Sequence, residues 1–144
     1  MNLLTTPGPS HGLLDVFDVP GLYDPSPNGY SHVAVVRLPA RVIHIAGQGG
    51  ENEDGQLSPS FEVQVGQALD NLQTALRSAQ ASLADVARMR ILVVDHDEDR
   101  LGIIARQVRQ RWANRPGPTC TLIPVPRLAL DGMLFEIEAE AYTA

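Results

Sequence analysis

The stretch RPGPTCTLIPVPRLALDGMLFEIEAEA, residues 115–141, carries the pattern that decides the fold. Apolar and acidic residues alternate near its end, with Phe135, Ile137, Ala139 and Ala141 interleaved with Glu136, Glu138 and Glu140. Because successive side chains of a β-strand point to opposite faces, this order predicts a strand with one buried apolar face and one acidic face. The run CTLIPVPRLA, 120–129, predicts a second strand, which begins at Cys120, the only cysteine of the chain.

Three earlier runs also have strand character. YSHVAVVRL, 30–38, and ARVIHIAG, 40–47, are rich in β-branched residues and partly alternate. Pro39 separates them, so we expect two adjacent antiparallel strands. DVARMRILVVD, 85–95, predicts a further strand that ends at Asp95.

Two segments, 58–83 and 97–112, have helical periodicity. Apolar residues recur there at spacings of three or four, at Val65, Leu69, Leu72, Leu76 and Ala79 in the first and at Leu101, Ile104, Ala105, Val108 and Trp112 in the second. Ser58 followed by Pro59 is the predicted start of the first helix. The acidic run DHDEDR, 95–100, is predicted to cap the second helix rather than to bind a metal ion.

The order of strands, helix, strand, helix and strands predicts an α+β fold, in which a mixed sheet carries both helices on one face. The other face of such a sheet also needs cover, and oligomerisation is the simplest way to supply it. Residues 1–29 are rich in Pro, Gly, Ser and Asn and are expected to be an irregular lead-in with a short strand at LLDVF, 13–17. Residues 30–144 are then expected to form a single domain.

The bulk composition excludes several classes of function. A net charge of −6 with only 5% aromatic residues leaves no basic, base-stacking surface, so nucleic acid is not an expected partner. A single cysteine forms no internal disulfide, and no stretch approaches the ~20 apolar residues that cross a bilayer. The N-terminal residues lack the pattern of a signal peptide, so a cytoplasmic protein without a membrane partner is expected.

Two glycine-containing segments resemble ligand-binding loops without matching them. ENEDG, 51–55, lacks the ligand spacing of a calcium loop and is predicted to be a turn. GQGG, 47–50, lacks the spacing of a dinucleotide-binding fingerprint. No metal or cofactor site is therefore predicted from these segments.

Four segments together resemble the Rid family of reactive-intermediate deaminases, also called YjgF-like or L-PSP endoribonuclease-like proteins. They are Gly29-Tyr30 before the first core strand; IAGQ, 45–48, where the family usually has Ser-Gly-Gln; residues 64–95, similar to the family's helix and following strand; and PTCTLIPVPRLALDGMLFEIEAEA, 118–141. The resemblance runs from about Tyr30 to Ala141, and the Glu-Ile-Glu-Ala ending is its most specific part.

Membership of this family implies a fold similar to that of chorismate mutase, with three subunits joined as a barrel-like homotrimer. It also implies small-molecule pockets between neighbouring subunits. Active members hydrolyse imines and enamines released by pyridoxal-phosphate enzymes, without a metal or an organic cofactor of their own. In those members an arginine just before the penultimate strand pairs with the substrate carboxylate, and a glutamate on the last strand positions water.

The family's site can be transferred residue by residue. Glu136 matches the water-positioning glutamate, and Tyr30 matches a tyrosine that borders the pocket. The arginine position falls on Cys120, with Thr121 next to it, and the serine of Ser-Gly-Gln is Ala46 here. A thiol offers neither the charge nor the bidentate fork that a guanidinium offers to a carboxylate, so we expect weak recognition of 2-imino acids.

The residues leave several alternatives open. Cys120 could be a pocket-lining group, a nucleophile or a small core residue, and Glu136 could be a solvated carboxylate of the strand face. The helix position at which many active members carry asparagine falls on Ala105. One hypothesis is a hydrolase for imines, enamines or related reactive carbonyl compounds, with Arg127 or Arg115 as a possible substitute anchor. The other is a non-catalytic trimer that binds a metabolite or regulates a partner, while ribonuclease activity fits poorly with the acidic charge balance.

Overall fold

The computed structural model describes residues 12–113 and 115–144. Positions 1–11, which begin the predicted lead-in, and position 114 lie outside the described residues. The elements, in chain order, are β1 (Leu14–Phe17), the 3₁₀ helix η1 (Ser26–Asn28), β2 (Val33–Val36), β3 (Arg41–Gly49), α1 (Phe61–Ser78), the 3₁₀ helix η2 (Leu83–Asp85), β4 (Val86–Val94), α2 (Glu98–Trp112), β5 (Thr119–Val125) and β6 (Phe135–Thr143).

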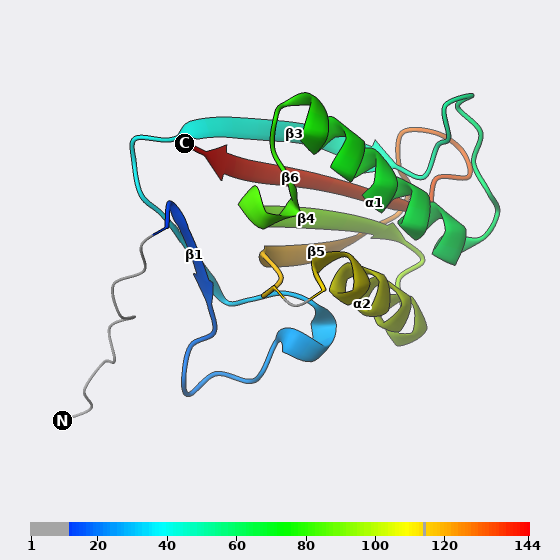
Figure 1. Ribbon diagram of the computed structural model, residues 1–144. Helices are drawn as coiled ribbons and strands as arrows, with labels where there is room; N and C mark the ends of the chain where they lie inside the picture. Colours follow the sequence, from blue (N-terminus) through cyan, green and yellow to red (C-terminus); the bar gives the residue numbers. More distant parts are fainter. Residues whose placement is uncertain (1–11, 114) are drawn as a thin grey trace.

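Four of these strands form the main sheet, in the order β3-β6-β4-β5 (Figure 1). The strand β6 is antiparallel to both of its neighbours, β3 and β4, whereas β4 and β5 are parallel. The predicted mixed sheet is therefore confirmed. Since β6 is the last strand in the sequence but a central one in space, the sheet is completed only when the end of the chain is in place.

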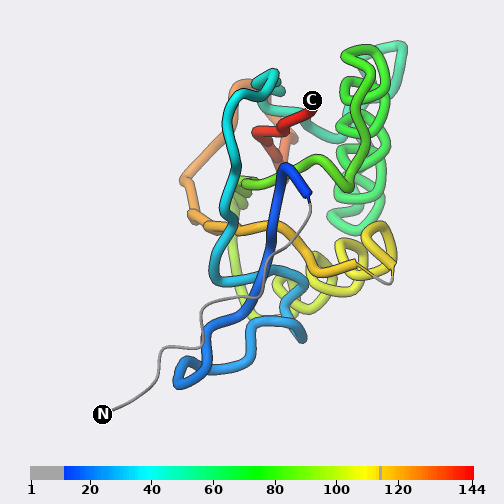
Figure 2. The backbone as a smooth tube through the Cα atoms, turned by 60° about the vertical axis from the view of Figure 1, so that its left-hand side comes forward, coloured from blue at the N-terminus to red at the C-terminus, as the bar shows by residue number. Residues whose placement is uncertain are grey.

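The side chains of β6 divide between the two faces of the sheet as the alternation predicts. Phe135, Ile137, Ala139 and Ala141 are buried, with exposed fractions between 0% and 4%. Both helices lie over this same face of the sheet, as Figure 2 shows, and the apolar stripes of α1 and α2 pack against it. The predicted α+β architecture with two helices on one face is confirmed, and the glutamates of β6 lie on the face that the helices leave uncovered.

A polar side chain caps the first turn of each of the two α-helices. Asp97 caps α2, its carboxylate accepting the backbone N–H of Arg100, so the predicted capping role of the acidic run is confirmed. The predicted start of the first helix at Ser58 is two residues too early. Ser60 is the capping residue, and its hydroxyl accepts the backbone N–H of Val63.

The predicted pairing of the two strands around Pro39 is wrong. The strand β2 pairs with β1 in a separate two-stranded sheet, and β3 pairs with β6. A run of β-branched residues specifies an extended backbone but not its partner, which depends on residues far away in the sequence. The predicted short strand in LLDVF is confirmed, because it is the strand that β2 pairs with.

A buried amide joins α1 to the segment that leads into β6. The side chain of Gln64 is fully buried, and its Nε2 donates to the carbonyl oxygens of Ser58 (2.7 Å) and Gly132 (2.8 Å). Its Oε1 accepts the backbone N–H of Leu134 at 2.9 Å. A Cβ atom at Gly50 would lie 2.6 Å from the Cα and Cβ of Gln64, so glycine is required there. These contacts fix where β6 enters the sheet.

We expect Gln64→Leu to lower the free energy of unfolding by about 1 to 3 kcal/mol, because it leaves backbone groups at Ser58, Gly132 and Leu134 without their partner. Urea denaturation followed by circular dichroism measures this change. Gln110→Leu, at an exposed position of α2, is the control and should change stability by no more than about 0.5 kcal/mol. Equal effects of the two substitutions would contradict the structural role of the Gln64 amide.

Candidate functional site

Three carboxylates lie in a row on the uncovered face of β6, and their surroundings differ. Glu138 accepts a hydrogen bond from Arg90 at 2.6 Å, and Glu140 lies 3.7 Å from the Nδ1 atom of His44. Glu136 has no such partner among the described residues. The sequence pattern did not distinguish these glutamates, whereas the structure leaves Glu136 as the unpaired one.

Glu136 lies against the backbone of β3. The pairing of β3 with β6 is irregular between Ile45 and Gln48, and a Cβ atom at Gly47 would lie only 1.8 Å from the Oε1 atom of Glu136. Any side chain at Gly47 would therefore displace the carboxylate. Burial raises the pKa of Glu136 above its usual value, and the negative charges of Glu51 and Glu138 raise it further.

Ala46 lies on the uncovered side of the sheet. It borders a cavity of about 320 Å³ between β3, β6 and β4, together with His44, Arg88, Arg90 and the two paired glutamates. The carbonyl oxygen of Ala46 accepts a hydrogen bond from the side chain of Gln48 at 3.0 Å. The predicted site residues Ala46 and Glu136 thus come from neighbouring strands, close to the irregular part of β3.

Tyr30 and Cys120 line a common cavity on the helix side of the sheet. This cavity of about 230 Å³ lies between η1, α2 and the strands β4 and β5, and is hereafter called the Tyr30–Cys120 cavity. Its other lining residues are Tyr23, Asn28, Met89, Ile91, Leu101, Ile104, Val108 and Leu122. The structure therefore brings these two predicted site residues together, but separates them from Glu136 by the thickness of the sheet.

The thiol of Cys120 is a neutral group in this cavity. It packs against the hydrophobic core, and burial raises its pKa to about 12. A nucleophilic cysteine needs the opposite shift, so the geometry favours a lining role over a nucleophilic one. Thr121, the next residue on β5, is exposed and points to the opposite face, as strand alternation requires, so it shares the face of Glu136.

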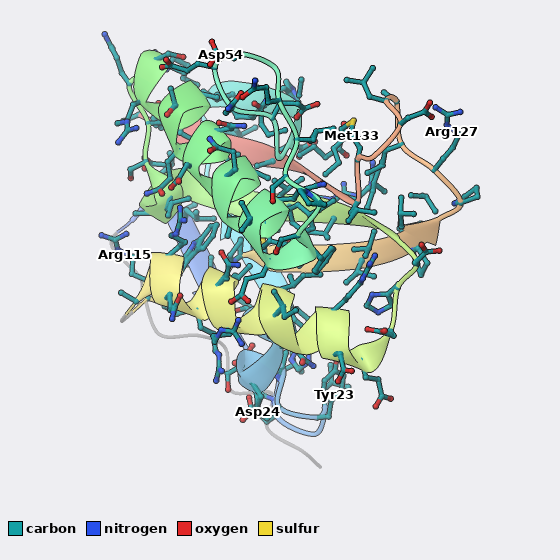
Figure 3. All side chains as sticks on the ribbon, turned by 90° about the vertical axis from the view of Figure 1, so that its right-hand side faces the viewer. Tyr23, Asp24, Asp54, Arg115, Arg127 and Met133 are labelled. Atoms are coloured by element: carbon teal, nitrogen blue, oxygen red, sulfur yellow. The ribbon has the colours of Figure 1, made fainter. Side chains whose placement is uncertain are left out.

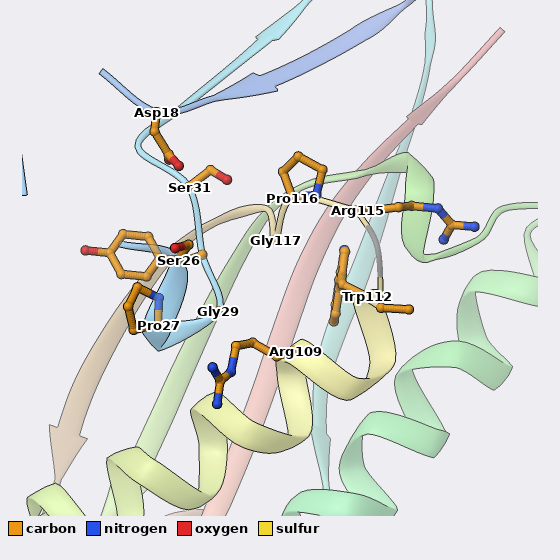
Figure 4. Close-up of a pocket in the computed structure, with 12 residues that line it drawn as sticks. Asp18, Ser26, Pro27, Gly29, Ser31, Arg109, Trp112, Arg115, Pro116 and Gly117 are labelled. Atoms are coloured by element: carbon orange, nitrogen blue, oxygen red, sulfur yellow. The ribbon is translucent and has the colours of Figure 1, made fainter. Parts of the chain in front are cut away.

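Tyr30 also borders a second cavity, of about 470 Å³, which Figure 4 shows in close-up. Arg109 and Trp112 from the end of α2, together with Arg115, line it. The two arginine side chains point in different directions rather than toward a common point. Neither of them lines the Tyr30–Cys120 cavity.

Arg127 is also distant from that cavity. It lies beyond the end of β5, where its guanidinium is 3.2 Å from the carboxylate of Asp131. Figure 3 shows Arg127 at the upper right and Tyr23 at the bottom of the view. Within one chain, therefore, neither Arg115 nor Arg127 lines the Tyr30–Cys120 cavity. Ala105, the predicted counterpart of the family's asparagine, is buried against the core side of α2, at 4% exposure.

Several residues of these sites were missed by sequence reasoning. The sequence analysis considers Gly47 only as part of the IAGQ and GQGG segments, and Glu51 only as part of a predicted turn. Both residues come near Glu136 because β3 pairs with β6, which is far away in the sequence, and no local signal indicates this pairing. Tyr23 and Asn28 lie in the predicted irregular lead-in but line the Tyr30–Cys120 cavity. The clustering of Pro, Gly and Ser around them indicated turns and gave no indication of a cavity.

Within ranges 12–113 and 115–144, no three His, Cys, Asp or Glu side chains gather as they would around a metal ion. Neither α1 nor α2, nor any other helix in those ranges, has the length and apolarity to cross a bilayer.

Comparison with known proteins identifies the family. Residues 24–143 match the family described as Endoribonuclease L-PSP. The RutC family protein YjgH of Escherichia coli (strain K12) is 31% identical over 100 residues, which cover 69% of this chain and 74% of YjgH. The chain therefore belongs to the endoribonuclease L-PSP family, which is the Rid or YjgF-like family of the resemblance described above.

Solved structures of the family share the fold. YyfB from Yersinia pestis, described as a protein of unknown function of the conserved Rid protein family, matches with a TM-score of 0.85 and 36% identity, over 90% of this chain and 98% of YyfB. Rv2704 from Mycobacterium tuberculosis, a member of the YjgF/YER057c/UK114 family, matches with a TM-score of 0.61 and 29% identity, over 90% of this chain and 99% of that one. The α+β fold is thus shared over almost the whole length of both proteins.

The raised pKa of Glu136 gives a pH-dependent prediction. A carboxyl group whose pKa is raised by folding stabilises the fold fully below its ordinary pKa, and this contribution is lost as the pH rises through the raised value. Glutamine mimics the protonated form at every pH. We therefore expect Glu136→Gln to raise the melting temperature at about pH 7.5 and to change it little at about pH 4.

Thermal unfolding at both pH values tests this expectation. Glu138→Gln is the matched control, because it removes the partner of Arg90 and should not stabilise the fold at about pH 7.5. A loss of stability in Glu136→Gln at the higher pH, or an equal gain at both, would show that the Glu136 carboxylate is not held in an unfavourable environment.

Proposed function

We propose that this chain forms a homotrimer with small-molecule clefts between its subunits, and that it hydrolyses imines, enamines or related reactive carbonyl compounds. In this proposal Glu136 is the catalytic residue. Tyr30, Cys120, Thr121 and Ala46 shape the substrate site. The observation that carries the proposal is the unpaired Glu136 carboxylate, which lies against Gly47 with a raised pKa, while Glu138 is paired with Arg90 and Glu140 lies near His44.

The division of the predicted site between two faces supports a cleft between subunits. Glu136 and Ala46 lie on the uncovered face near β3, while Tyr30 and Cys120 lie behind the edge strand β5. One chain does not bring these groups around one small molecule. A second copy that packs its β5 edge against the uncovered face of the first brings them together and also covers that face.

The proposed chemistry needs one acid-base group and one water molecule. Water attacks the imine carbon and loses a proton to the Glu136 carboxylate as the C–O bond forms. The protonated carboxyl then gives this proton to the nitrogen, which yields a carbinolamine. The carboxylate next takes the hydroxyl proton of the carbinolamine and passes it to the nitrogen as the C–N bond breaks, so that a carbonyl compound and ammonia are released. The raised pKa of Glu136 makes its carboxylate a stronger base, which favours the transfer of the proton from water. The chain has no lysine, so a Schiff base on a lysine side chain is not available as an alternative route.

Simple 2-imino acids are not the proposed substrates. Their carboxylate needs a paired cation when it is removed from water, and no arginine lines the Tyr30–Cys120 cavity. Arg88 and Arg90 lie on the uncovered face, but Arg90 is already paired with Glu138. A substrate without a free carboxylate avoids this requirement.

The alternative is a trimer that binds a metabolite or regulates a partner without catalysis. The observation that favours it is the loss of polar groups at family positions, since Ala46 and Ala105 carry methyl groups in place of polar side chains, and the arginine is absent. Under this alternative the raised pKa of Glu136 reflects only the crowding of carboxylates on β6.

A coupled assay with two sources of imine tests the proposed activity. An amine oxidase acting on benzylamine releases an uncharged imine, whereas an amino-acid oxidase releases 2-imino acids. We expect the protein to accelerate release of benzaldehyde and ammonia from the first and to leave the second unchanged. Glu136→Gln should lower the accelerated rate by about 100-fold or more, because it removes proton transfer, while Glu138→Gln should retain the activity.

Acceleration with 2-imino acids would show that another residue holds the carboxylate. Equal activity of Glu136→Gln and the unmodified protein would exclude Glu136 as the acid-base group. If neither imine is hydrolysed faster with the protein than without it, the non-catalytic alternative is favoured.

Light scattering tests the proposed oligomer. The homotrimer should have three times the 15.6 kDa mass of the chain. Ile123 is 39% exposed on the uncovered side of β5, so Ile123→Asp should lower the mass toward that of one chain by placing a charge in the interface. Leu22→Asp, at an exposed position outside the sheet, is the control and should leave the mass unchanged. A monomeric unmodified protein would contradict the cleft between subunits.

A further inference from the structure

The Tyr30–Cys120 cavity is built from apolar groups. Six of its lining side chains are aliphatic or thioether groups, namely Met89, Ile91, Leu101, Ile104, Val108 and Leu122. Among the described residues, no charged side chain lines it. The apolar lining also explains why the pKa of the Cys120 thiol is raised to about 12, because burial among these groups disfavours a thiolate. Such an environment strongly disfavours any ionised group of a ligand.

Polar groups of this cavity come from the η1 segment and its flanks. Tyr23, Asn28 and Tyr30 supply two phenol groups and one amide. The rings of both tyrosines make edge-to-face contacts with the ring of His32, with centroids 5.6 Å and 6.3 Å apart. The Nδ1 atom of His32 accepts the backbone N–H of Val19 at 3.2 Å, so the histidine that separates the two tyrosines is itself held in place. The cavity therefore has preformed aromatic walls.

The volume sets the size of the group that fits. A cavity of about 150 Å³ lined by aliphatic and aromatic side chains is large enough to bind benzene. The Tyr30–Cys120 cavity, at about 230 Å³, has room for a six-membered ring with a short substituent. A larger fused system would have to extend past Tyr23, which is 64% exposed.

We infer that the Tyr30–Cys120 cavity binds an uncharged, ring-sized apolar group, and that the substrates are imines or enamines that carry such a group in place of a carboxylate. The inference rests on the proposed function in taking this cavity as the part of the site that holds the substrate's side group. It assigns the substrate class, which the family's chemistry leaves open once the arginine is missing. The preference for a neutral group follows from the lining and does not depend on Glu136.

A matched pair of probes tests the inference by binding alone. Benzyl alcohol and benzoate have nearly the same size, but only benzoate is charged at neutral pH. We expect benzyl alcohol to shift the methyl resonances of Met89, Leu101 and Ile104 in a saturable titration, and benzoate to bind about tenfold more weakly or worse. Benzoate binding as tight as that of benzyl alcohol, or benzyl alcohol shifts confined to residues outside the cavity, would overturn the inference.

Two substitutions on α2 test whether a cation at the edge of the cavity changes the preference between benzyl alcohol and benzoate. Leu101 is only partly buried, so Leu101→Arg can place a guanidinium at the cavity edge and should shift the preference toward benzoate by about tenfold. Ile103→Arg, on the same helix but outside the lining, is the control and should keep the preference for benzyl alcohol. Thermal unfolding of both variants checks that they are folded. An unchanged preference in folded Leu101→Arg would show that the probes bind elsewhere.

Glu136→Gln separates this inference from the proposed activity. The substitution changes none of the residues that line the cavity and adds no charge, so benzyl alcohol should still shift the methyl resonances of the lining residues in the variant. If the unmodified protein binds benzyl alcohol in the cavity but does not accelerate imine hydrolysis, the proposed catalysis is refuted and the assignment of the cavity stands. Hydrolysis of uncharged imines without any probe binding in the cavity would refute the assignment and keep the catalysis.

Discussion

Phe135, Ile137, Ala139 and Ala141 pack beneath the two helices, and the position of every candidate functional group depends on this burial. Because a strand alternates, burying these side chains sends the three glutamates of β6 to the uncovered face. A slip of one residue would reverse both faces and bury three carboxylates. The buried amide of Gln64 supports the same register, because it holds the segment just before β6.

The two sides of the sheet consequently have different chemistry. The uncovered face carries the Arg90–Glu138 ion pair and the contact between His44 and Glu140, together with Glu136, which has no such partner among the described residues. The helix side carries an apolar cavity with a neutral thiol. Imine hydrolysis needs a proton-transfer group and a place for the substrate's side group, so the two sides offer complementary parts of one proposed site. Their separation by the sheet is the physical reason for placing that site between subunits.

The surroundings of Glu136 disfavour its ionised form. Burial and two neighbouring carboxylates disfavour its charged form, and no cation compensates for them in the described residues. Gly47 permits this arrangement, because any larger residue would occupy the position of the carboxylate. A group that is held in an unfavourable state by a well-packed backbone is typical of functional sites, where its altered acidity is useful.

The sequence by itself determined the elements and their buried faces, because the spacing of apolar residues is a local pattern that indicates both the type of element and the face that it buries. It therefore predicted β6, both amphipathic helices and the capping of α2 by Asp97. The resemblance of Gly29-Tyr30, IAGQ and the Glu-Ile-Glu-Ala ending added the family and the candidate residues Tyr30, Cys120 and Glu136. Only the tertiary structure decided which strand pairs with β2, that Glu138 is paired with Arg90 while Glu136 has no such partner among the described residues, and that Tyr30 and Cys120 share an apolar cavity. Those features depend on contacts between residues far apart in the chain, and a local pattern contains no information about them.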